Sequence, residues 1–110
     1  MNQQGTIFKG MFKGGMKDGD GVKVFANGNR LEGVWKENKF TKGKFIQQGG
    51  AIYDGEWLGG RAHGQGKKEW PDGKAYQGMF RFGKPWGAGI KIYPDGKERI
   101  GYWDNDAFID

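Results

Sequence analysis

The sequence alternates glycine and aromatic positions with polar ones in short runs that recur along the chain. In the run Tyr53-Asp-Gly55-Glu-Trp57, the two rings and the glycine share one parity and the carboxylates take the other. This period of two predicts a strand that carries its rings on one face. Gly59-Gly60 then marks a tight turn, and Gly64-x-Gly66-x-Lys68-x-Trp70 continues the pattern in the same parity. The stretch therefore predicts a β-hairpin.

The same pattern restarts at a nearly constant interval. Its starts lie at Phe8, Leu31, Tyr53, Tyr76 and Arg99, which are 22 or 23 residues apart. A constant period of this length indicates stacked repeats, each burying its apolar face against its neighbours. Four hairpins, named repeats 1 to 4, and a last strand at Arg99–Trp103 predict about nine strands. The predicted fold is all-β, a single-layer antiparallel sheet of successive hairpins over residues 7–103, between a flexible N-terminus (1–6) and an acidic C-terminal tail (104–110).

Rings and glycines recur at matching places, and this predicts how the sheet is packed. Glycine inside a strand weakens a sheet unless another group approaches the backbone closely. A ring can lie over the glycine of a neighbouring strand and cover its backbone, as in aromatic rescue. The rings expected to form this structural layer are Phe8, Phe12, Phe25, Trp35, Tyr53, Trp57, Trp70, Tyr76, Phe80, Tyr93 and Trp103.

Three stretches carry a family resemblance: YDGEWLGGRAHGQGKKEWPDG at 53–73, QGMFRFGKPWGAG at 77–89 and KGMFKGGMKDGDG at 9–21. They resemble MORN (membrane occupation and recognition nexus) repeats, whose unit is Y-x-G-x-W-x-x-G-x-x-H-G-x-G. The resemblance extends over about residues 7–103. It implies the hairpin array, in a family found in phospholipid kinases, membrane-junction proteins, histone methyltransferases and flagellar structures.

Repeat 2 departs most from this unit. Asn38 replaces the turn glycine, Thr41 stands where the first paired glycine should be, and one residue is missing. Phe45 falls at a place where the other repeats carry lysine. We expect a local bend or weak point in the sheet at this repeat.

The composition argues against an enzyme. The chain has no Cys and no Ser, so it lacks a disulfide framework and the usual acyl-transfer nucleophiles. The single histidine, His63, belongs to the repeat unit and is expected to support its hairpin turn. We expect no catalytic residues, no metal site and no cofactor. No apolar run is long enough to span a membrane.

The net charge of +5 lies in the first half of the chain. Residues 1–50 hold nine Lys and Arg against four acids, and residues 51–110 hold nine against nine. The candidates for binding an anionic partner are Lys23, Lys36, Lys39, Lys42, Lys44, Lys68 and Lys91. Three of them, Lys23, Lys68 and Lys91, share one repeat position on the ring-bearing face. Either their aliphatic stems cover the rings, or their ammonium groups form a cationic row for an anionic partner. No nucleic-acid-binding motif accompanies these lysines, which argues against nucleic acid as the partner.

The same parity places a second apolar set on the face opposite the rings. Its members are Met11, Val22, Val24, Val34, Met79, Ile90 and Ile92. A single-layer sheet must hide such residues by curling or by binding, so we interpret them as a partner interface. The terminal strands also leave unpaired edges through which copies of the chain could associate.

These patterns together predict a non-enzymatic scaffold, a protein–protein interaction module of a larger cytoplasmic assembly. The family resemblance points to a cytoskeletal or ciliary/flagellar assembly. The alternative is a peripheral membrane adaptor that binds anionic phospholipids through the basic N-terminal half.

Overall fold

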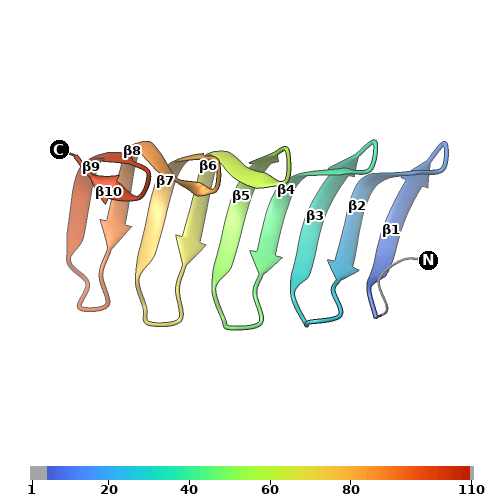
Figure 1. Cartoon of the computed structure of the whole chain (residues 1–110), viewed down its shortest axis with the longest axis horizontal. Coiled ribbons are helices and arrows are strands. Elements are labelled where there is room, and N and C mark those ends of the chain that lie inside the picture. Colours follow the sequence, from blue (N-terminus) through green and yellow to red (C-terminus); the bar gives the residue numbers. More distant parts are fainter. Residues whose placement is uncertain (1–4, 110) are drawn as a thin grey trace.

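The computed structural model describes residues 5–109 and contains ten strands in one antiparallel sheet (Figure 1). In chain order the strands are β1 (Ile7–Lys13), β2 (Met16–Val24), β3 (Arg30–Lys36), β4 (Lys39–Ile46), β5 (Ile52–Leu58), β6 (Arg61–Glu69), β7 (Ala75–Arg81), β8 (Lys84–Ile92), β9 (Glu98–Asp104) and β10 (Ala107–Phe108). Each strand pairs with its chain neighbours, and the sheet extends 46 Å with β1 and β10 at opposite ends. The prediction of an all-β, single-layer hairpin array is confirmed. Most of the predicted flexible N-terminus, residues 1–4, lies outside the described residues.

A row of glycines crosses the whole array. Strand pairing places one glycine from each of β1 to β9 side by side: Gly10, Gly21, Gly33, Gly43, Gly55, Gly66, Gly78, Gly89 and Gly101. A β-carbon at Gly55 would lie 2.5 Å from Gly66 Cα and 2.7 Å from Tyr53 Oη. A β-carbon at Gly21 would lie 2.6 Å from Phe8 Cζ. The rings therefore occupy the space that the missing side chains leave, as the sequence predicts.

The rings form an unbroken ladder on one face of the sheet, here called the ring face. Successive centroids are 4.7 to 5.7 Å apart along Phe12, Phe8, Trp35, Phe40, Trp57, Tyr53, Phe80, Tyr76, Trp103 and Phe108. Most of these contacts are edge-to-face, an arrangement worth about 0.5–1.5 kcal/mol beyond the buried area. Burial is uneven along the ladder: Tyr76 and Phe80 are fully buried, whereas Phe12 is 60% exposed.

Each of the four repeat hairpins contains a bulge, where the register of strand pairing shifts. In repeat 3 the register shifts between Gly55 and Trp57. Tyr53 Oη donates a hydrogen bond to the carbonyl of Glu56, at 2.8 Å. Tyr76 makes the equivalent bond in repeat 4, to the carbonyl of Met79 at 2.9 Å. The tyrosine at the start of these repeats thus covers glycine with its ring and satisfies a backbone acceptor with its hydroxyl.

Repeat 2 has a shorter bulge. Its register shift between Val34 and Trp35 skips one residue of β4 instead of two, which accommodates the missing residue. Thr41 Oγ1 donates to the carbonyl of Val34 at 2.9 Å, and Val34 is the counterpart of Glu56. The pairing of β3 with β2 and of β4 with β5 continues on both sides. The irregularity expected at repeat 2 therefore takes the form of a shorter bulge within a continuous sheet.

The turn of repeat 2 keeps the geometry of the glycine turns. Glu37 and Asn38 adopt φ of 49° and 71°, close to the 61° and 83° of Gly59 and Gly60. Positive φ at both central residues matches the right-handed twist of a two-residue hairpin. Asn38 Oδ1 also accepts a hydrogen bond from the backbone N–H of Lys17, at 2.8 Å. That bond ties this turn to the preceding hairpin.

The array has one strand more than predicted. A turn at Asn105 and Asp106 leads into β10, which pairs with the end of β9. The ring of Phe108 lies 5.1 Å from that of Trp103 and closes the ladder, and the guanidinium of Arg99 lies 4.6 Å over Phe108. Covering Trp103, which is only 3% exposed, gives this short strand its stability. Part of the segment predicted as an acidic tail (104–110) therefore belongs to the sheet, as the turn after β9 and the strand β10.

Candidate functional site

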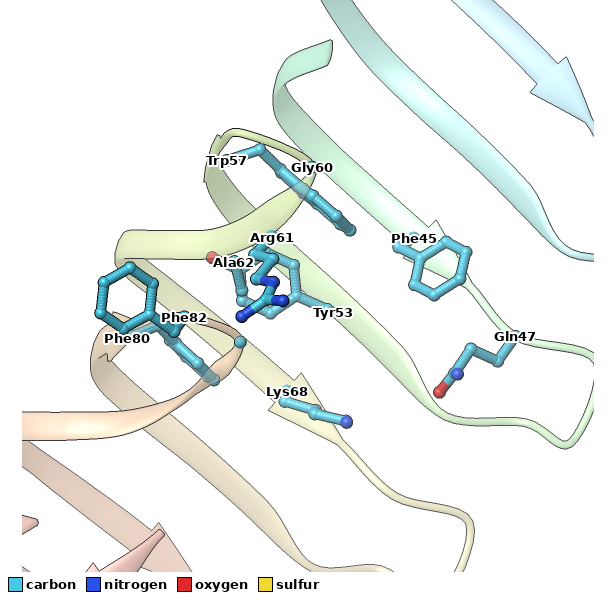
Figure 2. A pocket seen from close by; sticks show the side chains of 11 residues that line it. Phe45, Gln47, Tyr53, Trp57, Gly60, Arg61, Ala62, Lys68, Phe80 and Phe82 are labelled. Atoms are coloured by element: carbon cyan, nitrogen blue, oxygen red, sulfur yellow. The ribbon is translucent and has the colours of Figure 1, made fainter. Parts of the chain in front are cut away.

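A cleft of about 280 Å³ opens on the ring face around repeat 3 (Figure 2). Its aromatic walls come from three repeats: Phe45 from β4, Tyr53 and Trp57 from β5, Phe80 from β7 and Phe82 from the β7–β8 turn. The ring of Phe45 lies 5.8 Å from that of Trp57. Because the other repeats carry lysine at the place of Phe45, this apolar wall is a consequence of the departure of repeat 2 from the family unit.

The polar groups of the cleft are mainly cationic. Arg61 and Lys68 line it together with Gln47, and within residues 5–109 no acidic side chain does. Figure 2 shows the rings gathered around Arg61, with Lys68 and Gln47 toward the lower side of the view. Trp57 Nε1 is buried and finds no hydrogen-bond acceptor among the described residues. Apolar walls with cations and spare N–H donors suit an apolar side chain flanked by carboxylates.

The tyrosine hydroxyl in the cleft is a structural donor. Burial, with smaller contributions from the charges of Glu56 and Asp54, raises the pKa of Tyr53 above its ordinary value of about 10. The hydroxyl therefore stays protonated at neutral pH and keeps its bond to the Glu56 carbonyl. His63 is half-buried, with its ring 6.2 Å from that of Phe82 in the next repeat's turn. Nowhere in residues 5–109 do three His, Cys, Asp or Glu side chains gather as a metal site.

The lysines predicted to bind an anionic partner are divided between the two faces. Lys23, Lys68 and Lys91 lie in one row on the ring face, with their ammonium groups 5.1 to 6.0 Å over nearby rings. This geometry suits stems that cover the rings. By strand alternation, the lysines of the β3–β4 hairpin point to the opposite face: Lys36, Lys39, Lys42 and Lys44. The seven lysines therefore cannot form one row.

The apolar interface set lies on the face opposite the rings, here called the second face. Strand pairing separates it into two clusters, Met11, Val22, Val24 and Val34 on β1 to β3 and Met79, Ile90 and Ile92 on β7 and β8. Charged residues of β4 to β6 occupy the strip between them. The predicted interface is therefore two apolar patches around a charged centre.

Sequence reasoning missed two residues that extend the second patch. Ile100 and Tyr102 on β9 are 68% and 60% exposed, and with Ile90 they line a shallow hollow of about 470 Å³. The alternation in the predicted strand Arg99–Trp103 already placed both on the second face. The cleft could not have been found in this way, because it joins side chains of three repeats.

The family match agrees with this architecture. The MORN repeat model matches residues 8–30, 53–75 and 76–98, which is more than half of the chain. The protein belongs to the MORN-repeat family, whose repeat is a non-catalytic module associated with protein interaction or membranes. The unmatched interval, 31–52, is repeat 2. Residues 5–109 contain no helix, and so none with the length and hydropathy of a membrane span.

Similar proteins include Alsin from several mammals. The chain is 43% identical to Alsin of Rattus norvegicus and 44% identical to Alsin of Mus musculus and of Homo sapiens, in each case over 50 residues. These matches cover 46% of this chain but only 3% of each relative. The likeness thus concerns a small part of Alsin and assigns no particular role to this chain.

Proposed function

We propose that this protein is a non-enzymatic interaction scaffold whose ring-face cleft holds an acidic segment of a protein partner. The observation that supports it is the cleft itself, with five rings in its walls and two cations and no acid among the described residues that line it. A leucine or phenylalanine of the partner would fill the cavity while neighbouring carboxylates meet Arg61 and Lys68. Membership of a cytoskeletal or ciliary assembly stays a prediction.

Synthetic peptides test the chemistry of the cleft directly. One peptide carries a single leucine between glutamates, a second carries the leucine between lysines, and a third has glutamates with alanine. We expect only the first to bind, with a change in tryptophan fluorescence, because Trp57 lines the cleft. Arg61→Glu together with Lys68→Glu should weaken that binding at least ~10-fold, since like charges then face each other.

The matched control lies one repeat further along the chain. Lys84 is the counterpart of Arg61 in repeat 4 and does not line the cleft, so Lys84→Glu should leave binding unchanged. Equal binding of the acidic and basic peptides, or the same loss with Lys84→Glu, would contradict the proposal.

An anionic membrane is the second candidate partner. It is favoured by the four lysines that the β3–β4 hairpin presents on the second face: Lys36, Lys39, Lys42 and Lys44. Each basic residue near an anionic surface contributes about 1 kcal/mol of attraction. Wild-type protein should then sediment with phosphatidylserine vesicles at physiological salt, and replacement of the four lysines by alanine should abolish this. Absence of wild-type sedimentation would eliminate the candidate.

A further inference from the structure

The second face carries a charge pattern centred on its two middle strands, β4 and β5. Cross-strand partners in the central row are Glu32, Lys44, Asp54 and Lys67, which alternate in sign from β3 to β6. On one side of this row the partners are Arg30, Ile46, Ile52 and Glu69. On the other side Lys42 pairs with Glu56. Each of these charges on β3 or β4 thus has a charge of opposite sign at the mirrored position on β6 or β5.

The charges nearest the centre are available to a partner. Lys42, Lys44, Asp54 and Glu56 are all exposed, and of these Glu56 also accepts a hydrogen bond from the backbone N–H of Gln65, at 2.9 Å. The ion pairs that the described residues form on this face run along single strands, Arg30 with Glu32 at 2.6 Å and Lys67 with Glu69 at 3.9 Å. None of the four central charges takes part in them. Alternating sign also stabilises the pairing of neighbouring strands, but the four side chains stay accessible from the second face.

Consider a second copy of the chain packed on this face and related to the first by a two-fold axis that is parallel to the strands and lies between β4 and β5. Strand β4 of one copy then faces β5 of the other, and β3 faces β6. The facing pairs are Lys44 with Asp54, Lys42 with Glu56, Glu32 with Lys67, Arg30 with Glu69 and Ile46 with Ile52, and symmetry forms each pair twice. Every central charge meets its opposite, and the two isoleucines meet each other.

Other two-fold arrangements of the same face do not have this property. An axis perpendicular to the strands sets each strand against itself, so that Lys44 faces Lys44 and Asp54 faces Asp54. An axis displaced by one strand, to lie between β3 and β4, sets Asp54 against Val22 and leaves it unpaired. Because juxtaposed like charges cost several kcal/mol, the pattern favours one arrangement over the others.

We propose that the second face is an interface between two copies of this chain, related by the axis between β4 and β5. Packed sheets lie about 10 Å apart with strand directions about 30° from each other. Lysine and glutamate side chains can meet over that distance, and the angle displaces positions near the axis least. Further out, Ile7, which is 56% exposed, faces Ile92 and adds apolar burial. The ring faces point outward, so the proposal does not depend on what the cleft binds.

Charge reversal at one facing pair tests the arrangement by sedimentation of the full chain. Lys44→Glu and Asp54→Lys each place two like-charged pairs in their own dimer, so each variant should self-associate at least ~10-fold more weakly than wild type. An equimolar mixture should recover association, because the new carboxylate at position 44 faces the new ammonium at position 54. Lys97→Glu is the matched control, since its side chain is 84% exposed in the β8–β9 connection, and it should associate like wild type.

Three results would overturn the proposal: a wild-type chain that is monomeric at every concentration, a mixture no stronger than its separate variants, or a dimer that neither reversal weakens. The last would indicate pairing through the sheet edges instead. Circular dichroism verifies that each variant is folded. Should either variant unfold, the two single variants Lys42→Glu and Glu56→Lys, measured separately and mixed, repeat the test at the adjacent facing pair.

Discussion

Repeats 2 and 3 build the same hairpin from different side chains. In repeat 3 the hydroxyl of Tyr53 reaches a carbonyl at the bulge, whereas in repeat 2 Leu31 takes the tyrosine's place and Thr41 supplies the hydroxyl from the opposite strand. Thr41 itself stands where repeat 3 has glycine. Two departures from the repeat unit thus compensate each other, so that this carbonyl has a hydroxyl donor in repeat 2 as it has in repeat 3.

The comparison also separates what can vary from what cannot. The turn accepts Glu37 and Asn38 in place of two glycines, although positive φ is unfavourable for Glu37. The glycine row accepts no substitute in either repeat: Gly33 and Gly43 face each other as Gly55 and Gly66 do. The turn residues and the hydroxyl donor can thus be replaced by other side chains in this chain, whereas the facing glycines are glycine in both repeats.

The largest effect should come from the glycine row. A β-carbon at Gly66 would lie 2.7 Å from the ring carbons Cε1 and Cζ of Tyr53, so Gly66→Val should destabilise the protein by about 3 kcal/mol or more. Gly49 has open space around it, and Gly49→Val is the control, with an expected change below ~0.5 kcal/mol. Urea denaturation measures both. Equal stability of the two variants would show that ring-over-glycine packing does not hold the sheet.

Alkaline pH should weaken the two halves of the array unequally. Burial raises the pKa of both Tyr53 and Tyr76 above about 10, while Phe8 and Leu31 take the same place in repeats 1 and 2. The folded state holds these phenolic protons more tightly than the unfolded state, so this contribution to stability is complete below pH 10 and is lost as pH rises toward the folded pKa. The loss is at most about 1.4 kcal/mol per tyrosine per pH unit.

Urea midpoints measured against pH for wild type and for Tyr53→Phe with Tyr76→Phe provide the measurement. The double variant should lose this alkaline dependence, although it starts from a lower stability. An unchanged pH profile in the double variant would mean that other groups dominate alkaline unfolding.

The smallest effect is the most direct check on the comparison. Tyr53→Phe and Thr41→Val each remove a hydroxyl with little change of shape and leave a partly buried carbonyl without its donor. Each should cost about 1 kcal/mol, and the two costs should be similar because the carbonyls are equivalent. Thr41→Ser retains a hydroxyl and should recover most of the loss. A cost for Tyr53→Phe alone would show that Thr41 does not take over its role.

The period and the parity of the sequence were enough to predict the sheet, its repeats and the two faces. They could not predict the size of each bulge, because that depends on which backbone groups meet across two strands. The cleft needed Phe45 and Phe80 to be close, although 35 residues separate them. Strand β10 has only two residues, too few for alternation to reveal. The self-complementary charges became visible only with the register, which places residues of four strands in one row.

The chain-order pairing of the strands has a mechanical consequence. All strands lie across the long axis, and each is bonded only to its neighbours in sequence. A pull applied between β1 and β10 would load every strand pair in series, because among the described residues each strand bonds only to its neighbours. Extension would then begin at the weakest pair, which is β9–β10 with two paired positions against six for β1–β2, and would continue one hairpin at a time. Such a molecule behaves as a tether that lengthens in repeat-sized steps.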